Sequence, residues 1–394
     1  MSLTREQTDV LIEKGFSRRR FGRISSLLAA GAALPFYNEF TMAQEADEQA
    51  ARRRAAMGMR RAMDPDAVRI TSNENPLGPC KEGLEAIYKV APLGGRYSPT
   101  GEAADFTTMM AEVEGVKPDY VLVSAGSSPV LMASSCAFTS PTRSWTMGNP
   151  GYGGGAPAYI GSKVVRVPLR PDHTHDVEAM IKADPNAGAY YVCNPNNPTG
   201  TITPRKDIEY LLAHKAKDAV VVVDEAYIHL SDSAQMCSDL VAKDKDVVVL
   251  RTFSKAYGMA GIRAGAAIAR PDLLAKMRTF AGGGMLPITG MACAAASLRV
   301  KSLVPERRAY NKGVREDVFA YLEKKNVDYI KSETNFFMMT LKGMTGQQVN
   351  DAFAKHKVMI GRTWPVWPQR VRVSVGLKEE MAKFKDALDK VLNA

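Results

Sequence analysis

The sequence has few of the residues that bind metals or form redox pairs: 5 cysteines and 5 histidines in 394 residues. No two cysteines have the spacing of a zinc or redox motif, so we expect small buried hydrophobes, no disulfide framework and no metal site. His173 and His175 share a polar, turn-like stretch, which indicates a solvated loop better than a pair of ligands. The cysteines are Cys80, Cys136, Cys193, Cys237 and Cys293.

The body of the chain also lacks an apolar run long enough to cross a bilayer. The formal net charge is +10, but no basic stripe with interleaved aromatic residues is present, which disfavours a nucleic-acid-binding protein. With 45% hydrophobic residues the chain has enough apolar side chains for a large core, and its length predicts two domains.

The N-terminal segment has the composition of an export signal. Residues 17–23 contain three consecutive arginines followed by Phe21, and a short apolar run follows over residues 24–36. This order is typical of a secretory signal, and the paired arginines favour the twin-arginine route. We expect residues 1–43 to be that signal and residues 44–63 a charged linker or peripheral helix. The predicted location is the periplasm or another exported compartment, otherwise the cytoplasm. The alternative for the signal is a basic amphipathic helix packed on the body.

Apolar runs and helical patterns alternate in the middle of the chain. Strands are predicted at residues 120–124, 189–193, 219–223 and 247–250, and a crossover helix at 207–217. Uninterrupted apolar strands linked by helices predict an α/β fold with a mostly parallel sheet covered on both faces. The polar motifs follow the ends of these strands, where open α/β sheets bind ligands.

The C-terminal part has a different rhythm, which predicts a smaller α+β domain. Strands are expected at residues 333–341, 358–362 and 370–375, helices at 347–356 and 379–392, and a segment near residues 70–96 completes the domain. We place the large domain at residues 101–298 and the small domain at 299–394. Residues 64–100 form a segment that joins the small domain and a dimer interface.

Lys255 has the most informative surroundings in the chain. Two hydroxyl residues, Thr252 and Ser254, precede it, and Arg263 follows eight residues later. The amine can form a Schiff base with an aldehyde cofactor, while the hydroxyls and the guanidinium can hold that cofactor's phosphate. The alternative is a solvated lysine at a strand-to-loop junction.

Four motifs, taken together, identify a family. They are Asn73-Glu74-Asn75-Pro76-Leu77-Gly78-Pro79, Asn194-Pro195-Asn196-Asn197-Pro198-Thr199-Gly200, Asp224-Glu225-Ala226-Tyr227 and Arg251-Thr252-Phe253-Ser254-Lys255-Ala256-Tyr257-Gly258. From about residue 66 to the end, the chain resembles the class I/II aminotransferases, which are fold type I enzymes dependent on pyridoxal 5'-phosphate (PLP). Within them it looks most like the histidinol-phosphate aminotransferase branch.

The resemblance assigns roles around the cofactor ring. Lys255 would bond to PLP and then move the proton between the substrate and the cofactor. Asp224 would face the pyridine nitrogen and keep it protonated. Asn197 and Tyr227 would hydrogen-bond the phenolic oxygen, and Tyr152 would stack on the ring. The glycines around Tyr152 leave a loop without that role as an alternative.

The phosphate site has a physical basis of its own. Gly126, Ser127 and Ser128 lie between a predicted strand and a helix-compatible segment, so backbone N–H groups and the helix dipole can meet an anion. Thr252, Ser254 and Arg263 would add hydroxyl and guanidinium contacts. By resemblance, Tyr97 would reach the phosphate of a neighbouring subunit, which implies a homodimer.

The resemblance also implies three substrate contacts. Arg372 would clamp the α-carboxylate, with an edge-strand arginine as the alternative, and Asn75 belongs to the motif that lines the substrate mouth. Arg362 matches a position that contacts substrate phosphate in the histidinol-phosphate branch. The sequence departs from that branch here, because Trp364 and Trp367 stand beside Arg362. The tryptophans favour an aromatic or apolar amino acid, or cap the small domain.

We therefore expect an aminotransferase acting on an amino acid and a 2-oxo acid. The same cofactor attachment also serves decarboxylases, eliminating lyases and racemases, which break a different bond. A non-catalytic binding protein on the same scaffold is the third alternative.

Overall fold

The structure is a computed structural model that describes residues 9, 12–13, 66–281 and 286–393. Apart from residues 9, 12 and 13, the predicted signal and the predicted linker lie outside the described residues. No helix within the described ranges combines the length and the apolar character that a membrane span requires.

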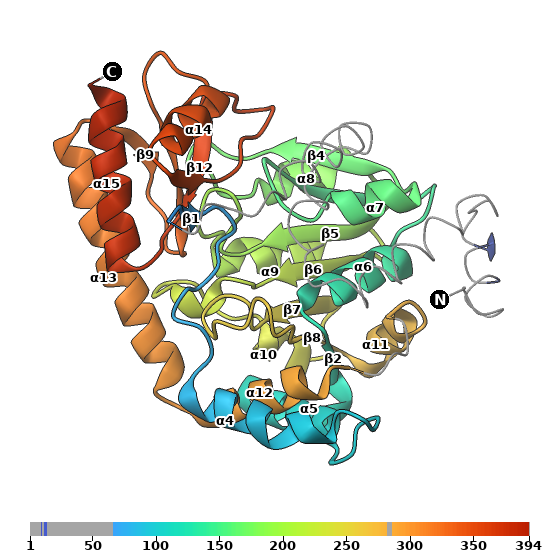
Figure 1. The fold of residues 1–394 in the computed structure, drawn as a ribbon. Coiled ribbons are helices and arrows are strands. Elements are labelled where there is room, and N and C mark those ends of the chain that lie inside the picture. Colours follow the sequence, from blue (N-terminus) through green and yellow to red (C-terminus); the bar gives the residue numbers. More distant parts are fainter. Residues whose placement is uncertain (1–8, 10–11, 14–65, 282–285, 394) are drawn as a thin grey trace.

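A seven-stranded sheet forms the centre of the larger part (Figure 1). Its order is β2-β8-β7-β6-β5-β3-β4, and every strand except β8 runs in the same direction. This confirms the predicted α/β fold with a mostly parallel sheet. The strands are β2 (Val121–Ser124), β3 (Ser144–Asn149), β4 (Val164–Pro168), β5 (Ala187–Cys193), β6 (Val220–Asp224), β7 (Val247–Thr252) and β8 (Gly265–Ala269).

Helices bury both faces of this sheet, which explains why its strands are apolar without alternation. In β6, Val221 and Val223 pack into one hydrophobic cluster, whereas Val220 and Val222 pack into another. The first cluster includes side chains of α5 (Glu102–Glu114), α8 (Val177–Ala183), α9 (Arg205–His214), α10 (Ser238–Ala242) and α12 (Ile288–Arg299). The second includes side chains of α6 (Ser127–Phe138), α7 (Gly155–Ile160) and α11 (Pro271–Arg278).

The C-terminal part has a separate hydrophobic core, and Figure 1 shows its helices and strands gathered to one side of the large sheet. Three antiparallel strands, β9 (Asp328–Ile330), β10 (Phe336–Thr340) and β12 (Arg370–Ser374), pack with α13 (Leu303–Lys324), α14 (Gly346–Lys355) and α15 (Lys378–Leu392). The remaining described elements are α4 (Lys81–Val90), which packs on α12, and three short helices, η1 (Ala91–Leu93), η2 (Pro118–Tyr120) and η3 (Ile228–Leu230).

The N-terminal end of the described body is tied to this C-terminal core. β1 (Val68–Ile70) pairs in parallel with β11 (Val358–Ile360). The chain then crosses to the large sheet through residues 71–75. This crossing brings the first motif of the sequence against the ends of β6 and β7.

One prediction about the loops was wrong. His175 is not solvated: it is 1% exposed, and its Nε2 lies 3.2 Å from the carbonyl of Cys193. The polar stretch around it folds back onto the sheet, because the His175 backbone N–H donates to Thr203 Oγ1 at 3.2 Å.

Candidate active site

Lys255 lies in the loop directly after β7, at the carboxyl edge of the sheet. It is only 4% exposed, although lysine is among the residues least often buried. Its Nζ donates to the carbonyl of Ser72 at 3.4 Å and lies 5.4 Å from the centre of the Tyr227 ring. A buried amine among polar groups at this edge is suited to react with a bound carbonyl compound.

Asp224 is the last residue of the neighbouring strand β6 and is 2% exposed. Its Oδ2 accepts a hydrogen bond from the Tyr191 hydroxyl at 2.8 Å, and its Oδ1 accepts one from the Ala226 backbone N–H at 3.2 Å. Burial, reinforced by the carboxylate of Asp224, raises the pKa of Tyr191 well above its usual range, so the phenol remains a proton donor.

Tyr227 receives two hydrogen bonds from asparagine side chains. The Nδ2 groups of Asn73 and Asn197 donate to its Oη at 3.1 Å and 3.3 Å. All three side chains are buried. The predicted residues Asn197 and Tyr227 therefore lie in contact with each other, whereas Asn73 was not selected from the sequence.

Arg372 joins the small domain to this group. Its Nη1 donates to Asn197 Oδ1 at 2.9 Å, and its Nη2 donates to the Thr71 carbonyl at 2.9 Å. The guanidinium carbon lies 5.5 Å from the centre of the Phe336 ring and 5.7 Å from that of Trp364. Arg362 is on the adjacent segment and is also buried, and its carbonyl accepts the backbone N–H of Arg372 at 2.9 Å. Two buried arginines thus lie on adjacent segments, joined by a backbone hydrogen bond.

The predicted phosphate residues converge as well. Gly126 precedes α6, whose first N–H groups have no partner within the helix. Arg263 donates from Nη1 to Ser254 Oγ at 3.3 Å and from Nη2 to the Ala125 carbonyl at 3.4 Å. Thr252 donates to Ser254 at 3.0 Å. A Cβ at Gly126 would lie 2.1 Å from Arg263 Nη2, so this close approach requires glycine.

Three predicted residues have other surroundings. Tyr152 is partly buried and packs against the cluster that contains Tyr191. Asn75 donates from Nδ2 to the Ala256 carbonyl at 3.0 Å, next to Lys255. Tyr97 is 80% exposed and lies in a stretch, residues 91–100, in which every residue is exposed. Within a single chain the structure therefore does not bring Tyr97 to the other site residues.

A buried ion network lies behind the site. Arg251 is 1% exposed and donates from Nε to Glu114 at 2.6 Å, from Nη1 to Glu225, and from Nη2 to Glu114 at 2.8 Å. Burial alone would raise the pKa of Glu114, but the Arg251 guanidinium lowers it below its usual value. Glu225 follows Asp224 directly, so this network fixes the backbone at the end of β6.

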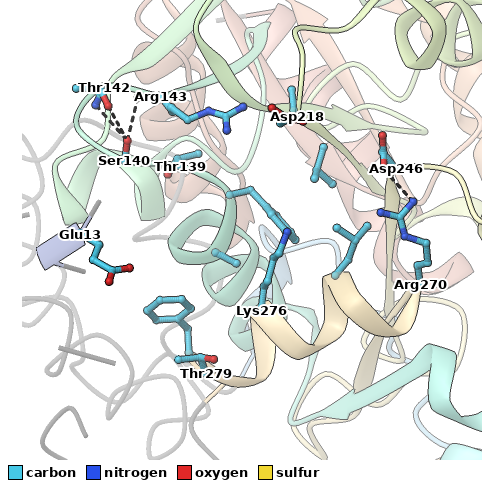
Figure 2. Close-up of a pocket in the computed structure, with 16 residues that line it drawn as sticks. Glu13, Thr139, Ser140, Thr142, Arg143, Asp218, Asp246, Arg270, Lys276 and Thr279 are labelled. Atoms are coloured by element: carbon cyan, nitrogen blue, oxygen red, sulfur yellow. Dashed lines mark hydrogen bonds and ion pairs between the residues drawn. The ribbon is translucent and has the colours of Figure 1, made fainter. Parts of the chain in front are cut away.

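A separate groove lies elsewhere. Its volume is about 770 Å³, and Figure 2 shows Arg143, Asp218, Asp246, Arg270 and Lys276 around it. Most of its residues precede β3, β6 and β7 or follow β8, which places it at the amino edge of the parallel strands, opposite Lys255. Arg270 pairs with Asp246 at 2.9 Å. None of the site residues described above lines this groove.

The family model for aminotransferase class I and II matches residues 65–388. The chain belongs to this family. It is 32% identical over 336 residues to histidinol-phosphate aminotransferase 1 of Nitrosococcus oceani, covering 83% of this chain and 89% of the relative. It is 31% identical over 343 residues to the aromatic amino acid aminotransferase of Cutibacterium acnes, covering 83% and 93%.

A solved structure shares the fold. Histidinol-phosphate aminotransferase from Sinorhizobium meliloti, in complex with pyridoxal-5'-phosphate, matches with a TM-score of 0.73 at 24% identity, covering 83% of this chain and 91% of that one. The protein is thus a PLP-dependent aminotransferase of fold type I. The residues present fit the cofactor: a buried amine, a buried carboxylate held by a tyrosine, and a glycine-lined anion site lie at one edge of the sheet.

Proposed function

We propose that Lys255 is the residue that bonds to the cofactor and carries the proton during amino transfer from an amino acid to a 2-oxo acid. PLP, when bound, supplies an aldehyde carbon and a ring that accepts electrons. Support for Lys255 comes from its burial and from its position one residue after Ser254, beside the anion site. An amine held at this edge of the sheet is placed to move a proton between the substrate and the cofactor.

In this proposal Asp224 keeps the ring nitrogen protonated, and Tyr191 holds the carboxylate in place. The Tyr191 hydroxyl and the Ala226 N–H both bond to the carboxylate from within the protein. Thr252, Ser254, Arg263 and the start of α6 bind the phosphate.

Arg372 binds the α-carboxylate of the substrate. A guanidinium offers five donors in a planar fork, which suits a carboxylate. Two of its nitrogens are occupied by Asn197 and the Thr71 carbonyl, and these bonds orient the guanidinium.

We propose an aromatic or apolar amino acid as the amino donor. Trp364, Met338 and Ile330 form a buried cluster with Trp367 packed against it, and the Trp364 ring faces Arg372. An aromatic wall beside the carboxylate clamp favours a donor with an apolar side chain. Sequence identity does not separate the two substrates, since it is 31% to an aromatic amino acid aminotransferase and 32% to a histidinol-phosphate aminotransferase.

The test is a donor screen on the protein loaded with PLP. Phenylalanine, tyrosine, aspartate and histidinol phosphate are each mixed with the enzyme, the loss of the visible cofactor band is recorded, and the products formed with 2-oxoglutarate are identified. Phenylalanine or tyrosine should bleach the band and yield glutamate. Preference for histidinol phosphate would refute the substrate proposal. Release of CO₂ would identify decarboxylation instead of transfer. Lys255→Ala should lack the band that the wild type shows before a donor is added, and should form no glutamate with any donor.

We further propose a homodimer in which Tyr97 serves the site of the partner subunit. The support is exposure: Tyr88 (72%), Leu93 (41%) and Tyr97 (80%) are large apolar or aromatic side chains exposed within ten residues of chain, and a partner would cover them. Mixing subunits tests this directly. If Tyr97 acts across the interface, dimers of one Lys255→Ala chain and one Tyr97→Ala chain contain one intact site and regain activity. If it acts within its own chain, mixing restores nothing.

Export by the twin-arginine route is proposed from the arginines at positions 18–20 alone. The segment lies outside the described residues. Replacing Arg18 and Arg19 by lysine and fractionating the cells tests the proposal, since an unchanged distribution contradicts it.

A further inference from the structure

We infer that Asn73 is a positioning residue that acts through Tyr227: together with Asn197 it forces the Tyr227 hydroxyl to donate its proton, toward the phenolic oxygen of the cofactor. The inference rests on the proposed function for the identity of the acceptor. The hydrogen-bond directions that carry it are properties of the chain itself.

The direction of the Asn197 amide is set by Arg372. A guanidinium has donors only, so the Asn197 atom that lies 2.9 Å from Arg372 Nη1 is the carbonyl oxygen. The amide nitrogen therefore faces Tyr227 and donates to its Oη at 3.3 Å. Because the Asn197 oxygen is already bonded to Arg372, it does not accept the tyrosine proton.

The Asn73 amide is bonded to Ser374 in the structure. The Ser374 hydroxyl accepts the backbone N–H of Asn73 at 2.8 Å and donates its own proton to Asn73 Oδ1 at 3.0 Å. The Asn73 Nδ2 is then directed at Tyr227 Oη, 3.1 Å away. Ser374 is buried, and no rearrangement to water competes with this arrangement.

Two N–H donors thus meet one phenol oxygen. Both bonds use the acceptor capacity of the oxygen, so the hydroxyl acts as a donor through its proton. Donors to an oxygen also polarise its O–H bond, which strengthens the bond that the hydroxyl donates. Tyr227 is therefore oriented as a hydrogen-bond donor, and Asn73 supplies one of the two N–H groups that orient it.

The backbone of Asn73 explains why this position needs asparagine. Its φ is +54°, in the left-handed region that asparagine tolerates better than most residues. Its carbonyl accepts from Asn335 Nδ2 at 2.9 Å, which fixes the turn. Glycine at position 73 would keep this backbone conformation without the amide, and aspartate would keep the shape but replace the donor by an acceptor.

The first measurement needs no cofactor. In protein labelled with ¹³C at tyrosine Cζ, the Tyr227 signal, assigned by its loss in Tyr227→Phe, reports the hydrogen bonds at Oη. We expect Asn73→Gly to shift this signal. Asn73→Asp should shift it further, because the carboxylate accepts a hydrogen bond from the tyrosine hydroxyl where the amide donated one. Asn335→Ala is the matched control: it loosens the same turn but leaves both donors, and the signal should stay. An unchanged signal in Asn73→Gly would overturn the inference.

The second measurement uses the protein loaded with PLP and follows the visible absorbance band against pH. A donor to the phenolic oxygen favours its anionic form, so weakening that donor makes the cofactor hold its proton to higher pH. Asn73→Gly should raise the proton affinity about tenfold, which moves the midpoint up by roughly one pH unit. Tyr227→Phe should move it further in the same direction.

A double-mutant comparison separates this role from a structural one. In the Tyr227→Phe background, Asn73→Gly should leave the midpoint where it is, because the hydroxyl through which Asn73 acts has gone. A shift of equal size in both backgrounds would overturn the inference. If the wild type forms no visible band with PLP, the proposed cofactor chemistry fails, and the Tyr227 signal in the cofactor-free protein then decides the inference alone.

Discussion

Tyr191 donates its hydroxyl proton to Asp224 across 2.8 Å, from one buried strand to the next. The two residues lie on paired strands, where Cys193 is opposite Asp224. Tyr191 lies two residues before Cys193 on β5, and its long side chain spans this offset to reach the Asp224 carboxylate. This bond gives the acid at the end of β6 a fixed direction, which a carboxylate held only by its own backbone would lack.

The first prediction follows from this pair. Tyr191→Phe should lower the affinity for PLP and kcat/KM by about tenfold each, since a hydrogen bond to a charged group contributes about 1.5–3 kcal/mol. Cofactor titration by fluorescence quenching and steady-state kinetics measure the two effects. Tyr190→Phe is the control, because Tyr190 lies on the same strand but packs in the other cluster and accepts only the Ala216 N–H. Equal losses in both variants would contradict the role of Tyr191.

The second prediction concerns the phosphate site. Gly126→Ala places a Cβ where Arg263 Nη2 now lies and should weaken PLP binding at least tenfold. Part of any effect comes from the backbone, because φ is +90° at Gly126. Gly101→Ala is a control for positive φ without a clash: its φ is +76° with ψ 29°, a less restrictive conformation than the ψ of 173° at Gly126, and no atom lies within 4 Å of the added Cβ. Gly101→Ala should cost about 1–2 kcal/mol of stability and leave PLP affinity intact.

The strands that were predicted share one property, which is a continuous run of large apolar residues. Residues 219–223 and 247–250 are mostly valine, and both became central strands, β6 and β7. β8 was missed because Gly265–Ala269 consists of glycine, three alanines and one isoleucine, residues with little preference for strands apart from Ile268. β8 is a strand because it pairs with β2 and β7 on either side. That pairing depends on the tertiary fold and cannot be read from the local sequence.

The site was predictable to the extent that residues follow strand ends. Lys255 and Asp224 do so, and the four motifs indicated their partners. The choice between the two asparagines of the first motif was not available from sequence, because Ser374, which orients Asn73, lies 301 residues away. Tyr191 was missed because a tyrosine inside a buried strand is indistinguishable in sequence from ordinary core packing.

The third prediction tests the buried ion network. Arg251→Met leaves Glu114 and Glu225 buried beside each other without their cation, and should lower the free energy of unfolding by about 3–5 kcal/mol. Urea unfolding measures the change. Arg299→Met removes an exposed pair with Asp105 and should cost about 1 kcal/mol or less. A similar cost for both arginines would show that burial does not matter here.

The fourth prediction is a loss of stability in mild acid. Burial lowers the pKa of both His175 and His229 from 6.5 to about 4, and the nearby Arg251 adds to the effect on His229 despite Glu114. Between these pH values the unfolded chain binds protons that the native protein does not. Stability is therefore lost as the pH falls from 6.5 to 4, by about 2 kcal/mol per histidine at pH 5.

Urea unfolding at pH 7 and pH 5 checks this sign. His229→Asn should reduce the difference between the two pH values by about 2 kcal/mol. His214→Asn, at an exposed position of α9, should leave the difference unchanged. If His229→Asn has the same pH dependence as the wild type, His229 is already protonated in the native state.

The pairing of β1 with β11, and the contacts of Thr71 and Asn73 with β12, have a consequence for biosynthesis. The ribosome must translate about three hundred further codons before residues 71–75, which include Asn73, can bond to their partners on β12. A nascent chain can assemble much of the large sheet while still attached, but it cannot close the catalytic pocket. Any PLP that binds earlier enters a site that is still open, so we expect stable cofactor binding only once the whole chain has been synthesised.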